Sequence, residues 1–342
     1  MNKPHKVAVL GGGSFGTAIA NMIAHNGERV TLWMRDETNA GYCREKRENT
    51  RYLPGYRLEE SLVVTSDMAG ALADCDLVFF SVPSKAFRSV ARAAAPHIPP
   101  HTMAVSTAKG IEGESFKLMS QILEDELDRP LVGVISGPNL AREIAKKQIT
   151  ATVIASELPA VCECVQEVLA THYFRVYSNY DRYGVELAGA LKNIYAIAAG
   201  IASAMEVGQN TLSVLLTRSL AEMTRFAARL GANPMTFLGL SGVGDLFVTC
   251  TSRLSRNFRI GEAIGQGHSL ADAIAEVGQV AEGINTTRIV KARADEMGVY
   301  MPLVGALYDI LFNDKSVRAV LRDIMLSEQS EDVEFRVGDN HG

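Results

Sequence analysis

Residues 6–20 read KVAVLGGGSFGTAIA, and they set the architecture of the N-terminal half of the chain. An apolar run leads straight into three glycines, and a helical pattern begins with no polar loop before it. Gly11, Gly13 and Gly16 have the spacing G-x-G-x-x-G between a predicted strand and a predicted helix. The first glycine of such a motif permits a tight turn, the second lets a pyrophosphate approach the backbone, and the third lets helix and strand pack closely.

The order of elements around these glycines predicts a dinucleotide site. A helix N-terminus offers unpaired N–H groups and a partial positive charge, which favour a phosphate without a lysine. Strand, motif, helix and a second strand over residues 29–33 follow one another within about 30 residues, as in dinucleotide-binding units. We therefore prefer a dinucleotide site to a glycine-rich turn that binds no ligand.

Arg35 and Asp36 follow that second strand, where an acidic residue usually binds the ribose 2′-hydroxyl of NAD. Arginine suits the 2′-phosphate of NADP and also stacks on adenine, and Asp36 can instead cap the next helix. A solvated arginine at a strand end is the alternative reading. The pair favours NADP, with NAD as the second cofactor to test.

Short apolar runs alternate with helical stretches up to about residue 178, and the runs are VAVL, VTLW, LVFFSV, MAVST, LVGVIS, TATVIA and YFRVYS. Such runs predict a parallel sheet covered on both faces, that is, a doubly wound α/β domain over residues 1–179. Helical patterns then replace the strands, which predicts an all-α domain over residues 180–342. A helix stop is expected at Gly231, before Asn233 and Pro234, and the polar tail 328–342 is expected to be loose.

Composition narrows the class of protein. The chain has 342 residues, 47% hydrophobic and 21% charged, which is a globular balance. Its net charge of −5 gives no general attraction to nucleic acid, and we find neither a membrane-spanning run nor a signal peptide. We therefore expect a cytoplasmic protein. Its five scattered cysteines are expected to be reduced, and with no matching ligand spacing around Cys162 and Cys164 we expect no metal site.

Lys192 and Asn193 are polar residues inside ELAGALKNIYAIAAG, a helical segment that is otherwise small and apolar. Partial desolvation would lower the proton affinity of this lysine and suit it to acid–base work. A lysine that extends to solvent is the alternative.

A second polar cluster lies in GLSGVGDLFVTCTSRLSRNFRIG, residues 239–261, which offers Asp245, Thr249, Thr251, Ser255, Arg256 and Asn257. An SRN run that opens a helix can donate hydrogen bonds to a phosphate, or can simply be a capped helix with an exposed arginine. Lys109 follows one predicted strand, and Gly137 and Asn139 follow another. Strand carboxyl ends face the ligand crevice in open α/β sheets, so these residues fit one site.

Eight motifs carry a resemblance to a known family, and in chain order they are LGGGSFGTAIA, VPSKAFR, STAKGIE, SGPNLAREIA, ELAGALKNIYAIAAGI, GLSGVGDLFVTCTS, SRNFRIG and VAEGINTT. Together they resemble the NAD(P)-dependent glycerol-3-phosphate dehydrogenases of the bacterial type. The resemblance implies a Rossmann-like domain followed by an all-α domain of the 6-phosphogluconate dehydrogenase kind, commonly as a homodimer. It also implies a cytoplasmic enzyme that interconverts sn-glycerol 3-phosphate and dihydroxyacetone phosphate to supply phospholipid synthesis.

The resemblance also assigns roles to residues. Lys192 matches the proton acceptor, and Lys109 matches a lysine that is shared by cofactor and substrate and polarises the same oxygen. Asp245 and Asn193 would orient Lys192 and the substrate hydroxyls. The matching cofactor contacts are Gly11, Gly13, Ser14, Phe15, Gly16, Arg35, Lys109, Ala141, Arg256, Val280 and Glu282. The matching substrate contacts are Lys109, Gly137, Asn139, Lys192, Asn193, Asp245, Ser255, Arg256 and Asn257.

One position departs from the family pattern. Asn139 stands where the family usually has serine or threonine; it keeps hydrogen-bonding capacity but is longer and lacks a hydroxyl, which leaves the substrate geometry there open. Phe15 occupies a variable aromatic position. Two other functions remain to be tested. One is a related two-domain dehydrogenase acting on a 3-hydroxy acid or ketopantoate, and the other is a dinucleotide sensor that has lost its chemistry.

Overall fold

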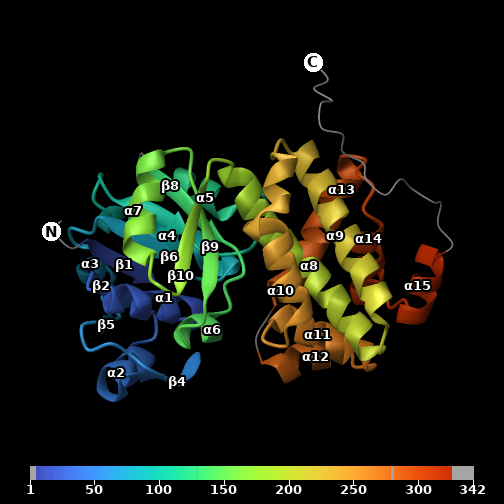
Figure 1. Cartoon of the computed structure of the whole chain (residues 1–342), viewed down its shortest axis with the longest axis horizontal. Helices are drawn as coiled ribbons and strands as arrows, with labels where there is room; N and C mark the ends of the chain where they lie inside the picture. Colours follow the sequence, from blue (N-terminus) through green and yellow to red (C-terminus); the bar gives the residue numbers. More distant parts are fainter. Residues whose placement is uncertain (1–4, 129, 279–280, 326–342) are drawn as a thin grey trace. The chain divides into compact units, whose positions relative to one another are not determined.

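The structure is a computed structural model that describes residues 5–128, 130–278 and 281–325. It divides into two compact units (Figure 1). The first unit comprises Met1–Ala190 and Leu238–Asp245, and the second comprises Leu191–Phe237 and Leu246–Gly342. The predicted tail 328–342 lies outside the described residues.

A single large sheet forms the centre of the first unit, and among the described residues it has eight strands in the order β10-β9-β8-β7-β6-β1-β2-β5. These strands are β1 (Lys6–Leu10), β2 (Arg29–Trp33), β5 (Val63–Thr65), β6 (Leu77–Phe80), β7 (Met103–Ser106), β8 (Leu131–Ser136), β9 (Thr150–Ala155) and β10 (Phe174–Asn179). All seven predicted apolar runs form strands of this sheet. The additional strand, β5, is only VVT, and β3 (Glu48–Asn49) pairs with β4 (Leu53–Arg57) in a separate antiparallel ribbon.

The sheet is mixed, which differs from the wholly parallel sheet that the apolar runs suggested. β9 pairs antiparallel with β8 and parallel with β10, so the last two strands run against the others. The connection between β8 and β9 explains the reversal, because its helix α6 (Ala141–Ala145) has five residues and rises only about 8 Å. A six-residue strand such as β8 spans roughly 20 Å, so this helix cannot carry the chain back along the sheet.

Helices cover both faces of this sheet, as the doubly wound prediction requires (Figure 1). They are α1 (Ser14–His25), α2 (Glu37–Lys46), α3 (Met68–Leu72), α4 (Ser84–Ala94), η1 (Ala95–His97), α5 (Met119–Glu126), α6 and α7 (Pro159–Leu169). Successive residues of β1 point to opposite faces, so Val7 and Val9 join a core with α1 and α7, while Ala8 and Leu10 join a core with α4 and α5. Burial on both faces explains why the central strands β1, β6, β7 and β8 are almost wholly apolar, whereas β10 at the sheet edge alternates buried and exposed residues.

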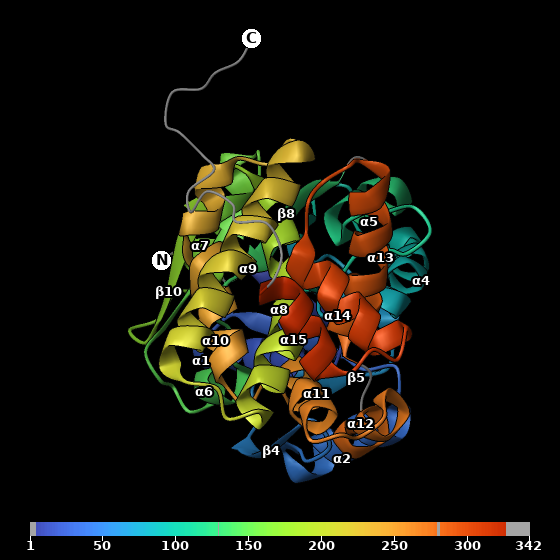
Figure 2. The same cartoon turned by 90° about the vertical axis from the view of Figure 1, so that its right-hand side faces the viewer.

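The second unit is helical over its described residues, in agreement with the prediction. Its helices are α9 (Gln209–Arg229), η2 (Pro234–Leu238), α11 (Arg256–Gly265), α12 (Leu270–Val277), α13 (Glu282–Glu296), α14 (Pro302–Phe312) and α15 (Val317–Met325). The helices α8 (Arg182–Ala204) and α10 (Asp245–Thr251) contribute residues to both units, as does η2 through its last residue Leu238, and the turn η3 (Leu240–Gly244) belongs to the first. Figure 2 shows α13, α14 and α15 as neighbours. The predicted helix stop is confirmed, because α9 ends at Arg229 and Gly231 has a φ of +91°.

Helices α8 and α11 pack with almost no space between their backbones. A Cβ atom on Gly200 would collide with the Phe258 carbonyl oxygen, and one on Gly261 would collide with the Ile197 carbonyl oxygen. Only glycine fits at such a contact. This close packing fixes the start of α11 against the part of α8 that carries Lys192 and Asn193.

Helix α8 contains the apolar segment ELAGALKNIYAIAAG, for which the sequence pattern predicts a helix. By length and composition it could cross a membrane, since an 18-residue window has a mean hydropathy of 1.3. However, 78% of that window is buried inside the protein. It is therefore the core helix of a soluble protein.

A buried carboxyl group on α8 makes the stability of the first unit depend on pH. Glu186 accepts hydrogen bonds from the Ser120 N–H (3.0 Å) and the Ser120 hydroxyl (2.5 Å) at the start of α5. Burial raises the pKa of Glu186 to about 7 from an ordinary 4.5, and these hydrogen bonds only partly oppose the rise. The folded chain therefore keeps a proton that the unfolded chain has released between about pH 4.5 and 7, so stability falls as the pH rises through this window.

We expect Glu186→Gln to remove this part of the pH dependence. The contribution of Glu186 to the free energy of unfolding is of the order of 3 kcal/mol at most, because each unit of pKa shift corresponds to about 1.4 kcal/mol. Thermal unfolding midpoints measured from pH 5 to 8 should fall less in the variant than in the wild type. Glu163→Gln, at an exposed position on α7, is the control and should leave the slope unchanged. Equal slopes for Glu186→Gln and the wild type would contradict the prediction.

Candidate active site

The glycine loop between β1 and α1 has the geometry that its motif requires. Gly11 has a φ of +126°, and a Cβ atom there would collide with the Ser81 carbonyl oxygen. A Cβ atom on Gly16 would collide with the Gly11 carbonyl oxygen, so helix and loop are in direct contact. Gly13 caps α1 without any side-chain hydrogen bond, and a Cβ atom there would meet nothing within 4 Å. The loop therefore leaves open space in front of the N-terminus of α1, a helix of twelve residues. This position suits an anionic phosphate group.

Neighbouring side chains hold this loop in place. The buried Asn49 amide donates to the Gly12 carbonyl (2.9 Å) and to the Thr17 hydroxyl (2.8 Å). The exposed Ser14 hydroxyl donates to the Tyr52 carbonyl at 2.6 Å. Two further predicted cofactor contacts, Phe15 on α1 and Ala141 at the start of α6, are partly buried against the core on this face of the sheet. The loop is thus supported from the β3–β4 ribbon and from α6.

Arg35 and Asp36, which follow β2, have different surroundings in the structure. Asp36 caps α2, since its carboxylate accepts the N–H groups of Thr38 (3.0 Å) and Asn39 (3.3 Å). Arg35 is exposed, and no acidic side chain pairs with it among the described residues. The capping role predicted for Asp36 is confirmed. Arg35 is accessible to a ligand with a phosphate group.

Lys109 lies at the centre of a polar cluster in the first unit. Its ammonium group donates to an Asp245 carboxylate oxygen at 2.5 Å and to the Gly137 carbonyl oxygen at 2.9 Å. Asp245 is 1% exposed, and the Lys109 side chain is 21% exposed. Lys109 and Gly137 follow the adjacent strands β7 and β8, whose carboxyl ends lie side by side. Three predicted site residues that are far apart in the sequence therefore meet in one cluster.

Lys192 is the centre of a second cluster, in the second unit. It is 5% exposed, and its ammonium group donates to the Thr249 hydroxyl of α10 at 2.6 Å. The alternative of a lysine that extends to solvent is therefore wrong. Thr249 is a partner that the sequence analysis noted among the polar residues but gave no role. Its position four residues after Asp245 puts the two side chains on the same face of α10, and that spacing was the available signal.

Asn193 begins a chain of hydrogen bonds across three helices of the second unit. The Asn257 amide donates to the Asn193 side-chain oxygen at 2.9 Å, and the Asn257 oxygen accepts the Gly283 N–H at 3.0 Å. Both asparagines are buried. The start of α11 and the start of α13 are thereby tied to α8 beside Lys192.

The predicted SRN run occupies the N-terminus of α11. The buried Ser255 caps the helix by accepting the Phe258 N–H at 3.3 Å, and Arg256 is exposed at the first helical position. This arrangement agrees with the simple capped helix and leaves the arginine accessible to an anion. Glu282 is half-buried in the first turn of α13, and the predicted cofactor contact Val280 lies outside the described residues.

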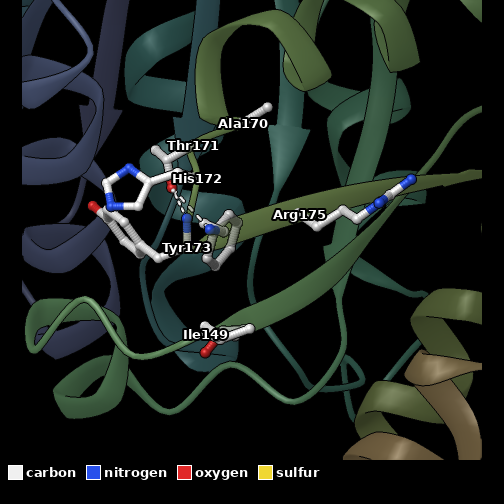
Figure 3. A pocket seen from close by; sticks show the side chains of 8 residues that line it. Ile149, Ala170, Thr171, His172, Tyr173 and Arg175 are labelled. Carbon is white, nitrogen blue, oxygen red and sulfur yellow. Dashed lines mark hydrogen bonds between the residues drawn. The ribbon is translucent and has the colours of Figure 1, made fainter.

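A shallow pocket in the first unit lies apart from all of these residues (Figure 3). It is lined by Ile149, Thr150 and residues 170–175, at the starts of β9 and β10. The Thr171 hydroxyl in it already accepts the N–H groups of Tyr173 (3.1 Å) and Phe174 (2.8 Å). No predicted site residue lines this pocket, and its Thr171 hydroxyl serves the local turn.

A glycine loop at the first βα turn, with the partly buried Lys109 and the buried Lys192 in polar clusters, is typical of the class of dinucleotide-dependent dehydrogenases. Family models for the NAD-dependent glycerol-3-phosphate dehydrogenase N-terminus and C-terminus match residues 6–162 and 181–322. The chain belongs to this NAD-dependent glycerol-3-phosphate dehydrogenase family.

Individual relatives agree with the family models. The chain is 59% identical over 338 residues to a glycerol-3-phosphate dehydrogenase (NAD(P)+) from Teredinibacter turnerae, covering 99% of each chain. Its fold is similar to that of a glycerol-3-phosphate dehydrogenase from Coxiella burnetii, with a TM-score of 0.91, 36% identity and coverage of 95% of this chain and 99% of that one. A ketopantoate reductase from Ralstonia eutropha shares the fold alone, with a TM-score of 0.58, 18% identity and coverage of 93% and 99%.

Proposed function

We propose that this chain is an NAD(P)-dependent glycerol-3-phosphate dehydrogenase that interconverts sn-glycerol 3-phosphate and dihydroxyacetone phosphate. The observation that carries the proposal is the match to the Teredinibacter turnerae relative over 99% of both chains. The partly buried Lys109 and the buried Lys192 support it, because a reaction at a carbonyl needs a group that polarises the oxygen and a group that exchanges its proton.

A spectrophotometric assay of NADPH oxidation tests this function directly. With dihydroxyacetone phosphate we expect turnover, and with ketopantoate or a 3-oxo acid we expect kcat/KM to be lower by about 1,000-fold or more, since a site with donors for a phosphate discriminates strongly against ligands that lack one. A preference for ketopantoate would favour the second dehydrogenase function. Binding of NADPH without turnover of any of these compounds would favour a dinucleotide sensor.

The residues around the glycine loop fit a dinucleotide. Gly11, Gly13, Ser14, Phe15 and Gly16 would hold its pyrophosphate at the start of α1, and Arg35 would lie at the adenosine end. Further contacts are proposed from Lys109, Ala141, Arg256, Val280 and Glu282. When bound, the nicotinamide ring supplies or accepts the hydride. We propose NADP as the preferred cofactor, with NAD accepted less well, because Arg35 is exposed while Asp36 is engaged as a helix cap.

Arg35→Ala should separate the two cofactors. A guanidinium group that binds the 2′-phosphate contributes roughly 1.5–3 kcal/mol, so kcat/KM for NADPH should fall about 10- to 100-fold. The value for NADH should change less than about threefold, since NADH has no 2′-phosphate. Arg51→Ala, at a nearby exposed arginine that pairs with Asp36, is the control. Equal losses for both cofactors would mean that Arg35 only stacks on adenine or is solvated.

The protein residues would manage the proton and the charge. In reduction Lys192 donates a proton to the oxygen on carbon 2, and in oxidation it removes a proton from the hydroxyl at the same atom. Lys109 polarises that oxygen, and its contacts with Asp245 and Gly137 limit the orientations of its ammonium group. Gly137, Asn139, Asn193 and Asp245 would orient the substrate, and Ser255, Arg256 and Asn257 would bind its phosphate.

The cellular setting is proposed from the same resemblance. We propose that residues 1–179 bind the cofactor and that residues 180–342 carry the substrate and proton-transfer groups. The enzyme would work in the cytoplasm as a homodimer and supply glycerol 3-phosphate for phospholipid synthesis. Light scattering after size-exclusion chromatography tests the dimer, since a mass near 37.0 kDa would indicate a monomer.

A further inference from the structure

Thr152 is a buried residue of β9 that lies against the turn following β8. It is 0% exposed. Its hydroxyl donates to the Ser136 carbonyl oxygen at 3.0 Å, and the same oxygen atom accepts the Asn139 amide at 2.8 Å. One hydroxyl group thus joins both ends of the four-residue turn Ser136–Asn139.

The chemistry of these three groups fixes the orientation of the Asn139 amide. A hydroxyl has one proton, and the Ser136 carbonyl oxygen can only accept it. Thr152 can then only accept from Asn139, so the NH2 side of the amide must face Thr152. The opposite side presents the Asn139 oxygen, which is buried and has no donor among the described residues. Thr152 therefore selects which atom of Asn139 a ligand can meet.

The same turn carries the carbonyl group that holds Lys109. Gly137 has a φ of +138°, and a Cβ atom there would lie 3.3 Å from the Thr152 Cα and 3.5 Å from its hydroxyl oxygen. The turn therefore packs directly on Thr152. Its Gly137 carbonyl oxygen is 2.9 Å from the Lys109 ammonium group. A change in the turn would move this carbonyl and alter the position of Lys109 between Gly137 and Asp245.

We propose that Thr152 is a positioning residue for the dehydrogenase reaction. Its hydroxyl holds the turn Ser136–Asn139 so that Gly137 fixes Lys109 and the Asn139 oxygen accepts a hydrogen bond from the substrate hydroxyl. This inference rests on the proposed function. The proposed function and the role of Thr152 are contradicted by different results. An inactive wild type contradicts the function. An active wild type whose Thr152 variants are equally active contradicts only the role of Thr152.

Thr152→Val tests the role of the hydroxyl, since valine keeps the shape of threonine and removes the oxygen. We expect kcat/KM for dihydroxyacetone phosphate to fall about tenfold or more, the loss associated with one buried hydrogen bond at a reacting site. The KM for NADPH should stay within about twofold, which separates an effect on the substrate from one on the cofactor.

Thr102→Val is the matched control. Thr102 is also buried, and its hydroxyl donates to the Cys75 carbonyl oxygen at 2.7 Å, just before β7 and thus at the other end of that strand from Lys109. Both valine variants should unfold at a lower temperature than the wild type, but only Thr152→Val should lose activity at a temperature where both are folded. Equal activities of the two variants would overturn the proposal and leave Thr152 a structural residue.

A second pair of variants keeps the test valid if valine disturbs folding. Thr152→Ser and Thr152→Ala lack the same methyl group and differ only in the hydroxyl. Serine should keep kcat/KM within about threefold of the wild type, and alanine should lose about tenfold. Equal kcat/KM values for serine and alanine would overturn the proposal.

Asn139→Ala provides the final comparison. If Thr152 acts partly through Asn139, the double variant with Thr152→Val should lose less than the product of the two single losses. Strictly multiplicative losses would overturn the part of the proposal that runs through Asn139.

Discussion

Replacing Lys192 with alanine is expected to lower kcat for dihydroxyacetone phosphate by about 1,000-fold, within the range that general acid–base groups contribute. Lys192 is 5% exposed and donates to the Thr249 hydroxyl at 2.6 Å, a contact that limits the positions of the ammonium group that would transfer the proton. The Kd for NADPH, measured by fluorescence titration, should change less than about threefold, because the glycine loop and Arg35 remain.

Two further variants make this prediction specific. Thr249→Val removes the hydroxyl that accepts from Lys192 at 2.6 Å, and it should lower kcat by a smaller factor of about 10. Lys315→Ala removes a surface lysine of the second unit that pairs with Asp309, and it should leave kcat unchanged. Unchanged turnover in Lys192→Ala would exclude the lysine as the proton donor. A loss of NADPH binding equal to the loss of turnover would make it a cofactor contact instead.

Local chemistry made much of the fold predictable. The central strands β1, β6, β7 and β8 are buried on both faces, so each appears in the sequence as a short continuous apolar run. Helix ends were predictable where one residue determines them, as with the Asp36 cap and the left-handed Gly231. Strand β5 was missed because three residues, VVT, give no measurable alternation.

Strand direction and long-range pairing were not predictable in the same way. The reversal at β9 depends on how far the connection after β8 can reach, and an apolar run contains no sign of its own direction. Lys109 and Asp245 are 136 residues apart, and nothing in their spacing indicates an ion pair. The family resemblance pairs Asp245 with Lys192, and that role stays a prediction beside the observed ion pair with Lys109.

Buried polar residues within apolar segments were the hardest to interpret. Glu186 and Lys192 both lie on α8, and both are buried with hydrogen-bond partners. From sequence, either could have faced solvent, because helical spacing gives the face of a side chain but not what covers that face. Thr152 gave no signal, since threonine is an ordinary residue of a strand.

Asp245→Asn is expected to lower kcat/KM for dihydroxyacetone phosphate by about 100-fold, because losing a correctly oriented group that stabilises the reacting oxygen typically costs about 100- to 1,000-fold in rate. The carboxylate is 1% exposed and lies 2.5 Å from the Lys109 ammonium group. Asparagine keeps the size of the side chain, but it removes the negative charge that orients the ammonium group toward the polarised oxygen.

A double variant shows whether this loss runs through Lys109. If Asp245 acts by holding that lysine, Lys109→Met with Asp245→Asn should be no less active than Lys109→Met alone. Asp125→Asn, which breaks partly exposed ion pairs with Lys117 and Arg88 in the same unit, should leave kcat/KM unchanged, because such pairs contribute little. Fully multiplicative losses at Lys109 and Asp245 would mean that the carboxylate acts on the substrate independently of the lysine, and the cluster would then have two separate functions.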